Sequence, residues 1–179
     1  GQARSRLLCP RLPLSERAVA AASGVITIGA QNCHHDDSGA FTGEVSATML
    51  RDAGAAAVIV GHSERRQQFG ETDAMVAAKA RAAARAGLLA IICIGETQAQ
   101  RTAGQALAVC ARQLAQSVPG EMSAVNGVIA YEPLCAVGRG RTPSPDGVNV
   151  MHAHIRLCLL TQLGAAGESR RLLDGGAVR

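Results

Sequence analysis

The stretch Ala57–Glu71, AVIVGHSERRQQFGE, carries the clearest indication of how this chain folds. Residues 57–60 are a short apolar run rich in β-branched side chains, which predicts a fully buried strand. Gly61 lets the chain turn without the steric cost of a Cβ atom, and His62 follows at once. Ser63 is a favoured N-cap residue, so His62 is expected at a strand end that faces the positive end of a short helix. This arrangement predicts a place for chemistry on an anion.

Strands and helices alternate on both sides of this stretch. Apolar runs predict strands at residues 5–9, 25–28, 57–60, 88–94, 128–131 and 170–173. Helices are predicted at residues 15–22, 46–53, 73–86, 97–117 and 144–163, with Ser15 and Asp73 among the expected caps. This order predicts βαβ units and a parallel sheet, although periodicity alone does not separate an open sheet from a barrel.

Length and composition place the chain in a broad class. With 179 residues it is expected to be one domain. Hydrophobic residues make up 47% and aromatic residues 2%, so Ala, Val, Leu and Ile must fill the interior, which suits helices packed on a parallel sheet. The formal charge is +4, but the basic residues are scattered without interleaved aromatics, so no nucleic-acid partner is predicted. No apolar run is long enough to cross a membrane, and no membrane association is predicted.

The cysteines and histidines give little sign of a metal site. Six cysteines form no CxxC motif and mostly lie in apolar runs, which predicts buried, reduced thiols in a cytoplasmic protein. His152 and His154 lie two apart on a predicted helix, so they face different directions, and no carboxylate stands at ligand spacing. We therefore predict no metal.

Polar residues recur just after the predicted strands. They are Gln31-Asn32, His62, Glu96, Glu132 and Gly175-Gly176. In parallel α/β folds, ligands bind outside the carboxyl ends of the strands. A site is therefore predicted at that edge, with His62 and Glu132 as a candidate acid–base pair across two strand ends.

Several of these segments resemble those of one enzyme family. Residues 61–66, GHSERR, resemble the segment around the electrophilic histidine of the triosephosphate isomerases. Residues 130–142, AYEPLCAVGRGRT, resemble that family's base glutamate and its mobile phosphate-gripping loop. The motifs GAQNC (29–33), GAFTGE (39–44), CIGE (93–96) and DGGAV (174–178) follow in the family's order at roughly its spacing. The resemblance extends from about Leu7 to Val178.

The resemblance implies an α/β fold, a TIM-barrel-like parallel sheet that is incomplete, with about six βα units. Residues 1–179 would be a single truncated TIM-barrel domain, since a whole barrel typically takes about 250 residues. The family's first and eighth strand–helix units have no counterpart in this sequence. The first unit carries the lysine that supplies a positive charge to the substrate. The only lysine here, Lys79, lies in the middle of a predicted helix and is not expected to replace it.

The implied activity is the interconversion of dihydroxyacetone phosphate and glyceraldehyde 3-phosphate, a step of glycolysis and gluconeogenesis. It needs no cofactor, and its partner is a small phosphorylated triose. Glu132 would take the carbon-bound proton, and His62, as a neutral imidazole, would polarise the carbonyl through an enediolate, a pairing for which this family is the standard example. Because the lysine has no counterpart, we expect reduced activity. The alternative is a non-catalytic truncated relative that dimerises or binds phosphate ligands.

Further site residues follow from the same resemblance. Backbone amides of Gly138, Gly175 and Gly176 would hold the phosphate, although Asp174 replaces the tyrosine that latches the lid. Glu64 either belongs to the catalytic site or pairs with an arginine. Arg65 and Arg66 are expected to form structural ion pairs. Thr42 would be the tip of a loop, residues 34–43, that reaches into a partner subunit, which implies a homodimer.

Overall fold

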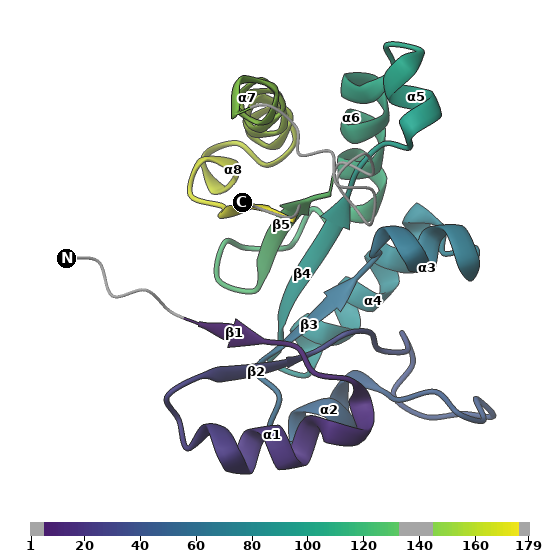
Figure 1. Cartoon of the computed structure of the whole chain (residues 1–179), viewed down its shortest axis with the longest axis vertical. Helices are drawn as coiled ribbons and strands as arrows, with labels where there is room; N and C mark the ends of the chain where they lie inside the picture. Colours follow the sequence, from purple (N-terminus) through teal and green to yellow (C-terminus); the bar gives the residue numbers. More distant parts are fainter. Residues whose placement is uncertain (1–5, 133–144, 176–179) are drawn as a thin grey trace.

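The computed structural model describes residues 6–132 and 145–175, which form one curved parallel sheet with helices around it (Figure 1). The strands are β1 (Leu7–Leu8), β2 (Thr27–Ala30), β3 (Ala57–Val60), β4 (Leu89–Ile94), β5 (Gly127–Tyr131) and β6 (Leu172–Asp174). They are hydrogen-bonded in sequence order, and every neighbouring pair is parallel. This order is that of a barrel wall, so the predicted TIM-barrel-like sheet of six units is confirmed.

The helices occupy the connections between strands. They are the 3₁₀ helix η1 (Leu12–Leu14) and the α-helices α1 (Ser15–Ala22), α2 (Ala47–Asp52), α3 (Ser63–Gln68), α4 (Asp73–Arg85), α5 (Gln98–Thr102), α6 (Ala106–Ser117), α7 (Pro145–Leu163) and α8 (Ala165–Glu168). The single helix predicted at residues 97–117 is wrong. Gly104 adopts φ +71° between α5 and α6, a left-handed conformation that glycine accepts at no steric cost and that ends a helix. Within the described residues, no helix is both long and apolar enough to cross a bilayer.

Three predicted helix caps lie one residue away from the observed ones. Ser15 and Ser63 are the first residues inside their helices, and the side chain of His62 caps α3 instead of Ser63. Asp73 likewise begins α4, and Thr72 before it accepts the hydrogen bond from the backbone of the first turn. A cap must precede the first turn for its side chain to reach the free N–H groups. His62 and Thr72 therefore take the role from the residues that follow them, whereas Leu14 gives α1 no side-chain cap.

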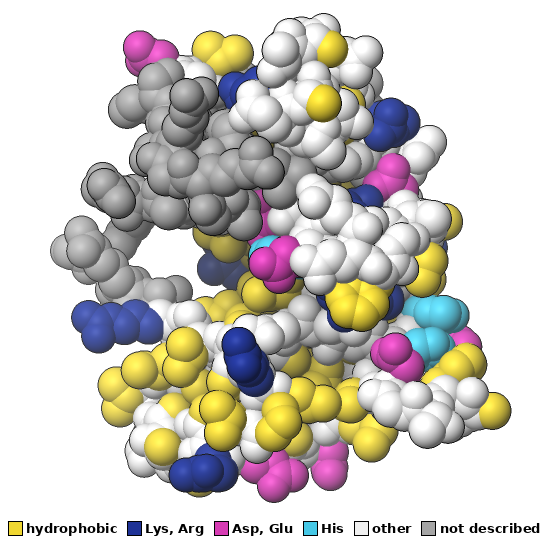
Figure 2. Space-filling model, turned by 45° about the vertical axis from the view of Figure 1, so that its right-hand side comes forward, with side chains coloured by type: hydrophobic (Ala, Val, Ile, Leu, Met, Phe, Trp, Pro, Cys, Tyr) yellow, Lys and Arg dark blue, Asp and Glu magenta, His cyan; other side chains and the backbone are white. Residues whose placement is uncertain are grey.

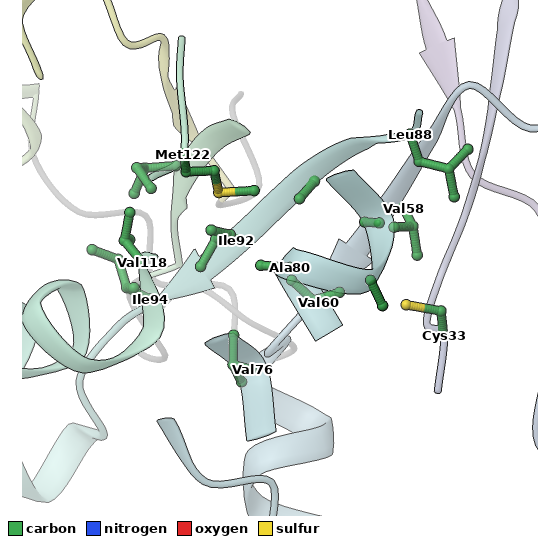
Figure 3. Packing of buried hydrophobic residues seen from close by; sticks show 14 of the residues in the cluster. Cys33, Val58, Val60, Val76, Ala80, Leu88, Ile92, Ile94, Val118 and Met122 are labelled. Atoms are coloured by element: carbon green, nitrogen blue, oxygen red, sulfur yellow. The ribbon is translucent and has the colours of Figure 1, made fainter. Parts of the chain in front are cut away.

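The main core lies between the sheet and its helices. Successive side chains of a strand point to opposite faces, and alternate residues such as Val58, Ile92 and Ile129 face the helices. Figure 3 shows Val58, Val60 and Ile92 of the strands in one cluster with Val76 and Ala80 of α4. Ala80, Ala82 and Ala83 of α4 are buried in the same cluster, so small side chains fill this part of the core without aromatic residues.

The concave face of the sheet carries a second, smaller apolar cluster. It consists of Ala57, Ile91, Cys93 and Ala130, and it therefore joins alternate positions of β3, β4 and β5. Glu132 follows Ala130 by two residues and projects from the same face of the sheet. The two apolar faces explain why these strands are nearly continuous apolar runs, as parallel strands covered on both sides are.

A buried polar network lies at the carboxyl ends of β4 and β5, on the side of the sheet that faces the helices. Tyr131, the only tyrosine, donates its hydroxyl proton toward both Glu96 oxygens at 3.2 Å and receives a bond from Arg101 at 2.7 Å. Glu96 is 1% exposed. Burial raises the pKa of the Tyr131 hydroxyl, and the negative charge of Glu96 raises it further. The phenol consequently stays protonated and keeps both strand ends fixed.

Candidate active site

His62 and Glu132 meet at the carboxyl end of the sheet. His62 follows β3 through Gly61, and Glu132 directly follows β5. The Nε2 atom of His62 lies 3.4 Å from Oε1 of Glu132, with 30% of the histidine side chain and 8% of the glutamate side chain exposed. The structure thus brings together the two residues that the sequence singled out, although they are far apart in the chain.

The hydrogen bonds of His62 determine its tautomer. The backbone N–H of Glu64 donates to Nδ1 of His62 at 3.2 Å. An accepting Nδ1 carries no proton, so in the neutral ring the proton is on Nε2. His62 therefore presents an N–H donor on the side of Glu132, which suits the polarisation of a carbonyl oxygen.

Glu64 itself lies beside His62 and faces solvent. One of its carboxylate oxygens is 3.9 Å from Nδ1 of His62, and 64% of its side chain is exposed. Among the described residues, its ion-pair contact is with His62, so of the two alternatives the pairing with an arginine is not observed. Arg65 and Arg66 do form the predicted ion pairs, with Glu71 and Asp73.

Two donors orient the carboxylate of Glu132. The backbone N–H of Ser63 donates to Oε2, and the thiol of Cys93 donates to Oε1, each at 3.2 Å. Burial, together with the charge of Glu132, raises the pKa of the Cys93 thiol well above its usual value, so Cys93 remains a donor at physiological pH. The sequence suggested mainly packing for Cys93; only its place in the motif CIGE connected it with the site.

Two glycines allow close packing around Glu132. A Cβ atom on Gly95 would lie 2.1 Å from the carbonyl oxygen of Glu132, and one on Gly175 would lie 2.6 Å from its Cγ atom. The N–H of Gly175 donates to the carbonyl of Tyr131 at 2.7 Å, so this amide is already engaged inside the sheet. Gly138 and Gly176, the other predicted phosphate donors, lie outside the described residues.

A cavity of about 490 Å³ opens next to His62. Its wall is made by the end of β2, the loop before α2, and α3. The lining is mixed: polar side chains are contributed by Gln31, Asn32, Glu44, His62, Glu64, Arg65 and Gln68, and apolar ones include Leu12, Val45, Ile59 and Phe69. A small phosphorylated metabolite or a loop of a partner chain fits a cavity of this size and character.

Lys79 lies behind the wall of this cavity and is not among its lining residues. It is 3% exposed, and its ammonium donates to Oε1 of Glu71 at 2.5 Å and to the side chain of Asn32 at 2.8 Å. Arg65 donates to the same Glu71 oxygen. Burial opposes ionisation of Glu71, but the hydrogen bonds and charges of Lys79 and Arg65 hold its pKa below the usual value. The prediction that Lys79 cannot act on substrate agrees with this burial.

One group of side chains has the donor types of a metal site. Ligand atoms of His34, His35 and Asp36 lie within 4.8 Å of one another. However, the two rings are stacked, with centroids 4.3 Å apart and planes 27° apart, so their in-plane lone pairs run side by side. Nδ1 of His34 also accepts the N–H of Asp36 at 3.1 Å. These residues would have to reorient before they could share one ion.

The sequence profile of the triosephosphate isomerases matches residues 2–179. The chain belongs to the triosephosphate isomerase family. A triosephosphate isomerase of Rhodopseudomonas palustris is 56% identical over 152 residues, which are 85% of this chain and 60% of that protein. A triosephosphate isomerase of Xanthobacter flavus is 50% identical over 180 aligned residues, 100% of this chain and 72% of that protein.

A solved structure agrees with the sequence relatives. The crystal structure of triosephosphate isomerase from Bartonella henselae superimposes with a TM-score of 0.90 at 44% sequence identity, over 97% of this chain and 70% of that one. The chain thus spans between 60% and 72% of the length of these three relatives. Within this span, β3 and β5 place His62 and Glu132 side by side at the carboxyl edge of the sheet.

Proposed function

We propose that this protein is an aldose–ketose isomerase that interconverts dihydroxyacetone phosphate and glyceraldehyde 3-phosphate. The observation that carries the proposal is the 3.4 Å approach of His62 Nε2 to Glu132 Oε1 at the carboxyl ends of β3 and β5. Membership of the triosephosphate isomerase family supports the choice of substrate.

In the proposed mechanism, Glu132 takes a proton from the carbon next to the substrate carbonyl. His62 donates a hydrogen bond from Nε2–H to the carbonyl oxygen, so that the negative charge left on carbon moves to this oxygen and an enediolate forms. His62 then gives its Nε2 proton to this oxygen and takes the hydroxyl proton of the neighbouring oxygen, while Glu132 returns its proton to the neighbouring carbon. Glu132 accepts hydrogen bonds from the Ser63 N–H and the Cys93 thiol. These bonds would hold the carboxylate in the orientation needed to reach the reacting carbon. Catalysis of this kind depends on positioned acid and base groups.

The test is a coupled isomerase assay that compares the parent protein with E132Q. Loss of the base should lower kcat by about 10²–10⁴, the usual contribution of a positioned acid or base. E121Q is a matched control, because Glu121 pairs with Arg81 on the surface and should leave kcat unchanged. An E132Q protein with the parent rate, or a parent protein without activity, would contradict the proposal and favour a non-catalytic relative.

We also propose that the protein forms a homodimer through the face around the cavity. Thr42 is exposed on the loop that follows β2, and Phe41 beside it is 39% exposed. Leu12 and Phe69, 48% and 64% exposed, are among the residues that line the cavity. Figure 2 shows hydrophobic side chains gathered on the lower part of the molecule, the part occupied by α1 and α2 in Figure 1. Burial of such a surface against a second copy would stabilise the assembly.

A cytoplasmic location is part of the same proposal. The five described cysteines, Cys9, Cys33, Cys93, Cys110 and Cys158, are all free thiols. Free thiols are typical of proteins in a reducing compartment such as the cytoplasm. The proposed triose phosphate substrate would be available in the same compartment.

A further inference from the structure

The side chain of Arg66 joins the ends of two strands behind the site. Its Nε donates to the carbonyl of Gly61 at 2.8 Å, and its Nη2 donates to the carbonyl of Cys93 at 3.2 Å. Gly61 is the residue before His62, and Cys93 is the residue whose thiol contacts Glu132. One guanidinium group therefore holds the backbone beside each member of the acid–base pair.

Arg66 is itself held in place by two further groups. Its Nη1 pairs with Asp73 at 2.5 Å, and its Nη2 also donates to Oγ of Ser117 at 3.0 Å. Ser117 in turn donates to the same Asp73 oxygen at 2.9 Å. The side chains of Arg66 and Asp73 are each 14% exposed. The four contacts of this guanidinium lie on α4, on α6, on β4 and on the residue after β3, so the side chain has little freedom to move.

The absence of a side chain at Gly61 leaves room for the guanidinium group of Arg66. Gly61 adopts φ +70°, and a Cβ atom there would lie 2.8 Å from both methyl groups of Val76 and 3.1 Å from Nη2 of Arg66. Any other residue would strain the turn and press on Val76 and on the guanidinium. Arg65, the neighbouring arginine, is oriented differently, since it lines the cavity beside His62 and pairs with Glu71.

We propose that Arg66 is a positioning residue that sets the spacing of His62 and Glu132, an inference that rests on the isomerase function proposed above. It touches neither substrate nor the reacting atoms. It acts through Gly61 on the turn that presents His62, and through Cys93 on the donor that orients Glu132. Misplacement of reacting groups by about 1 Å costs on the order of a hundredfold in rate, so loss of either contact should appear in kcat.

The test compares R66K with S117A. Lysine at position 66 keeps the positive charge and can pair with Asp73, but it lacks the planar fork that reaches two carbonyls at once. S117A removes a different contact of Arg66 and leaves both strand carbonyls bonded. Kinetics are measured at a temperature at which thermal unfolding curves show each variant fully folded.

The expected result is a kcat lowered by about tenfold to a hundredfold in R66K, with KM changed by less than about threefold, and near-parent kinetics in S117A. Side-chain ¹⁵N NMR of His62, identified among the five histidines by its absence from H62Q, should change in R66K and not in S117A. Equal kinetic effects in both variants, or a folded R66K with parent kcat and an unchanged His62 signal, would overturn the proposal. The NMR signal is measured without substrate. It therefore tests the positioning role of Arg66 even if the E132Q assay contradicts the proposed isomerase function.

Discussion

At the scale of single residues, both carboxylate oxygens of Glu132 accept hydrogen bonds, and Gly175 lies beside the Cγ atom of its side chain. Ser63 N–H and the Cys93 thiol fix the two oxygens. Gly175 leaves room for the Cγ atom, which a Cβ at that position would approach to 2.6 Å. The role of Gly175 is thus spatial in this structure, because its N–H is donated to Tyr131 rather than directed at a ligand.

We predict that G175A lowers kcat by about tenfold or more. The added methyl group must displace the Glu132 side chain, and a small displacement of a base is costly. Steady-state kinetics provide the measurement. G120A is the matched control, since no atom lies within 4 Å of a Cβ built on Gly120. A parent-like kcat for G175A would show that Glu132 can shift without loss.

At the scale of elements, α3 and α4 are joined by the buried carboxylate of Glu71. It receives Arg65 from α3 and Lys79 from α4, with 1% of its side chain exposed. Removal of one partner from a buried ion pair leaves an uncompensated charge, which costs about 3–5 kcal/mol. The network also holds Asn32 at the cavity, so it links the two helices to the segment that follows β2.

We predict that E71Q lowers the free energy of unfolding by about 3–5 kcal/mol near neutral pH. The folded-state pKa of Glu71 is below its ordinary value, so its stabilisation is present above the unfolded pKa of about 4.3 and is lost as the pH falls through the folded pKa. The difference between parent and E71Q should therefore shrink in acid. Urea unfolding at a series of pH values measures it, with the surface variant E121Q for comparison. A difference independent of pH would contradict this role.

At the scale of the whole molecule, the cavity beside His62 and the exposed loop at Thr42 lie on the face proposed for dimerisation. We predict a dimer mass by light scattering at micromolar concentration. T42R should shift the protein toward monomer, because a long charged side chain would have to be buried in the partner. V125R introduces the same charge at a site that is 86% exposed and should leave the mass unchanged. A monomeric parent protein would refute the proposed dimer.

The parts of the fold that the sequence revealed were those governed by local pattern. The apolar run at Val58–Val60 identified a strand, and polar residues after the strands identified His62 and Glu132 because parallel strands end at a common edge. Caps such as Thr72 were missed by one residue, because adjacent cap-forming residues give the same local signal. The contacts of Arg66 with Cys93, and of Cys93 with Glu132, join residues 27 and 39 positions apart, and no local pattern encodes them.

The buried hydroxyl of Tyr131 has a practical consequence for spectroscopy. The chain has one tyrosine and no tryptophan, so absorbance and circular dichroism in the tyrosine band report on a single ring, one residue before Glu132. Because folding raises the pKa of this phenol, its stabilising effect is complete below the unfolded pKa of about 10 and is lost as the pH rises. Above a pH of about 10, tyrosinate absorbance should therefore appear together with the loss of structure, so this single ring serves as an optical probe of the carboxyl edge of the sheet.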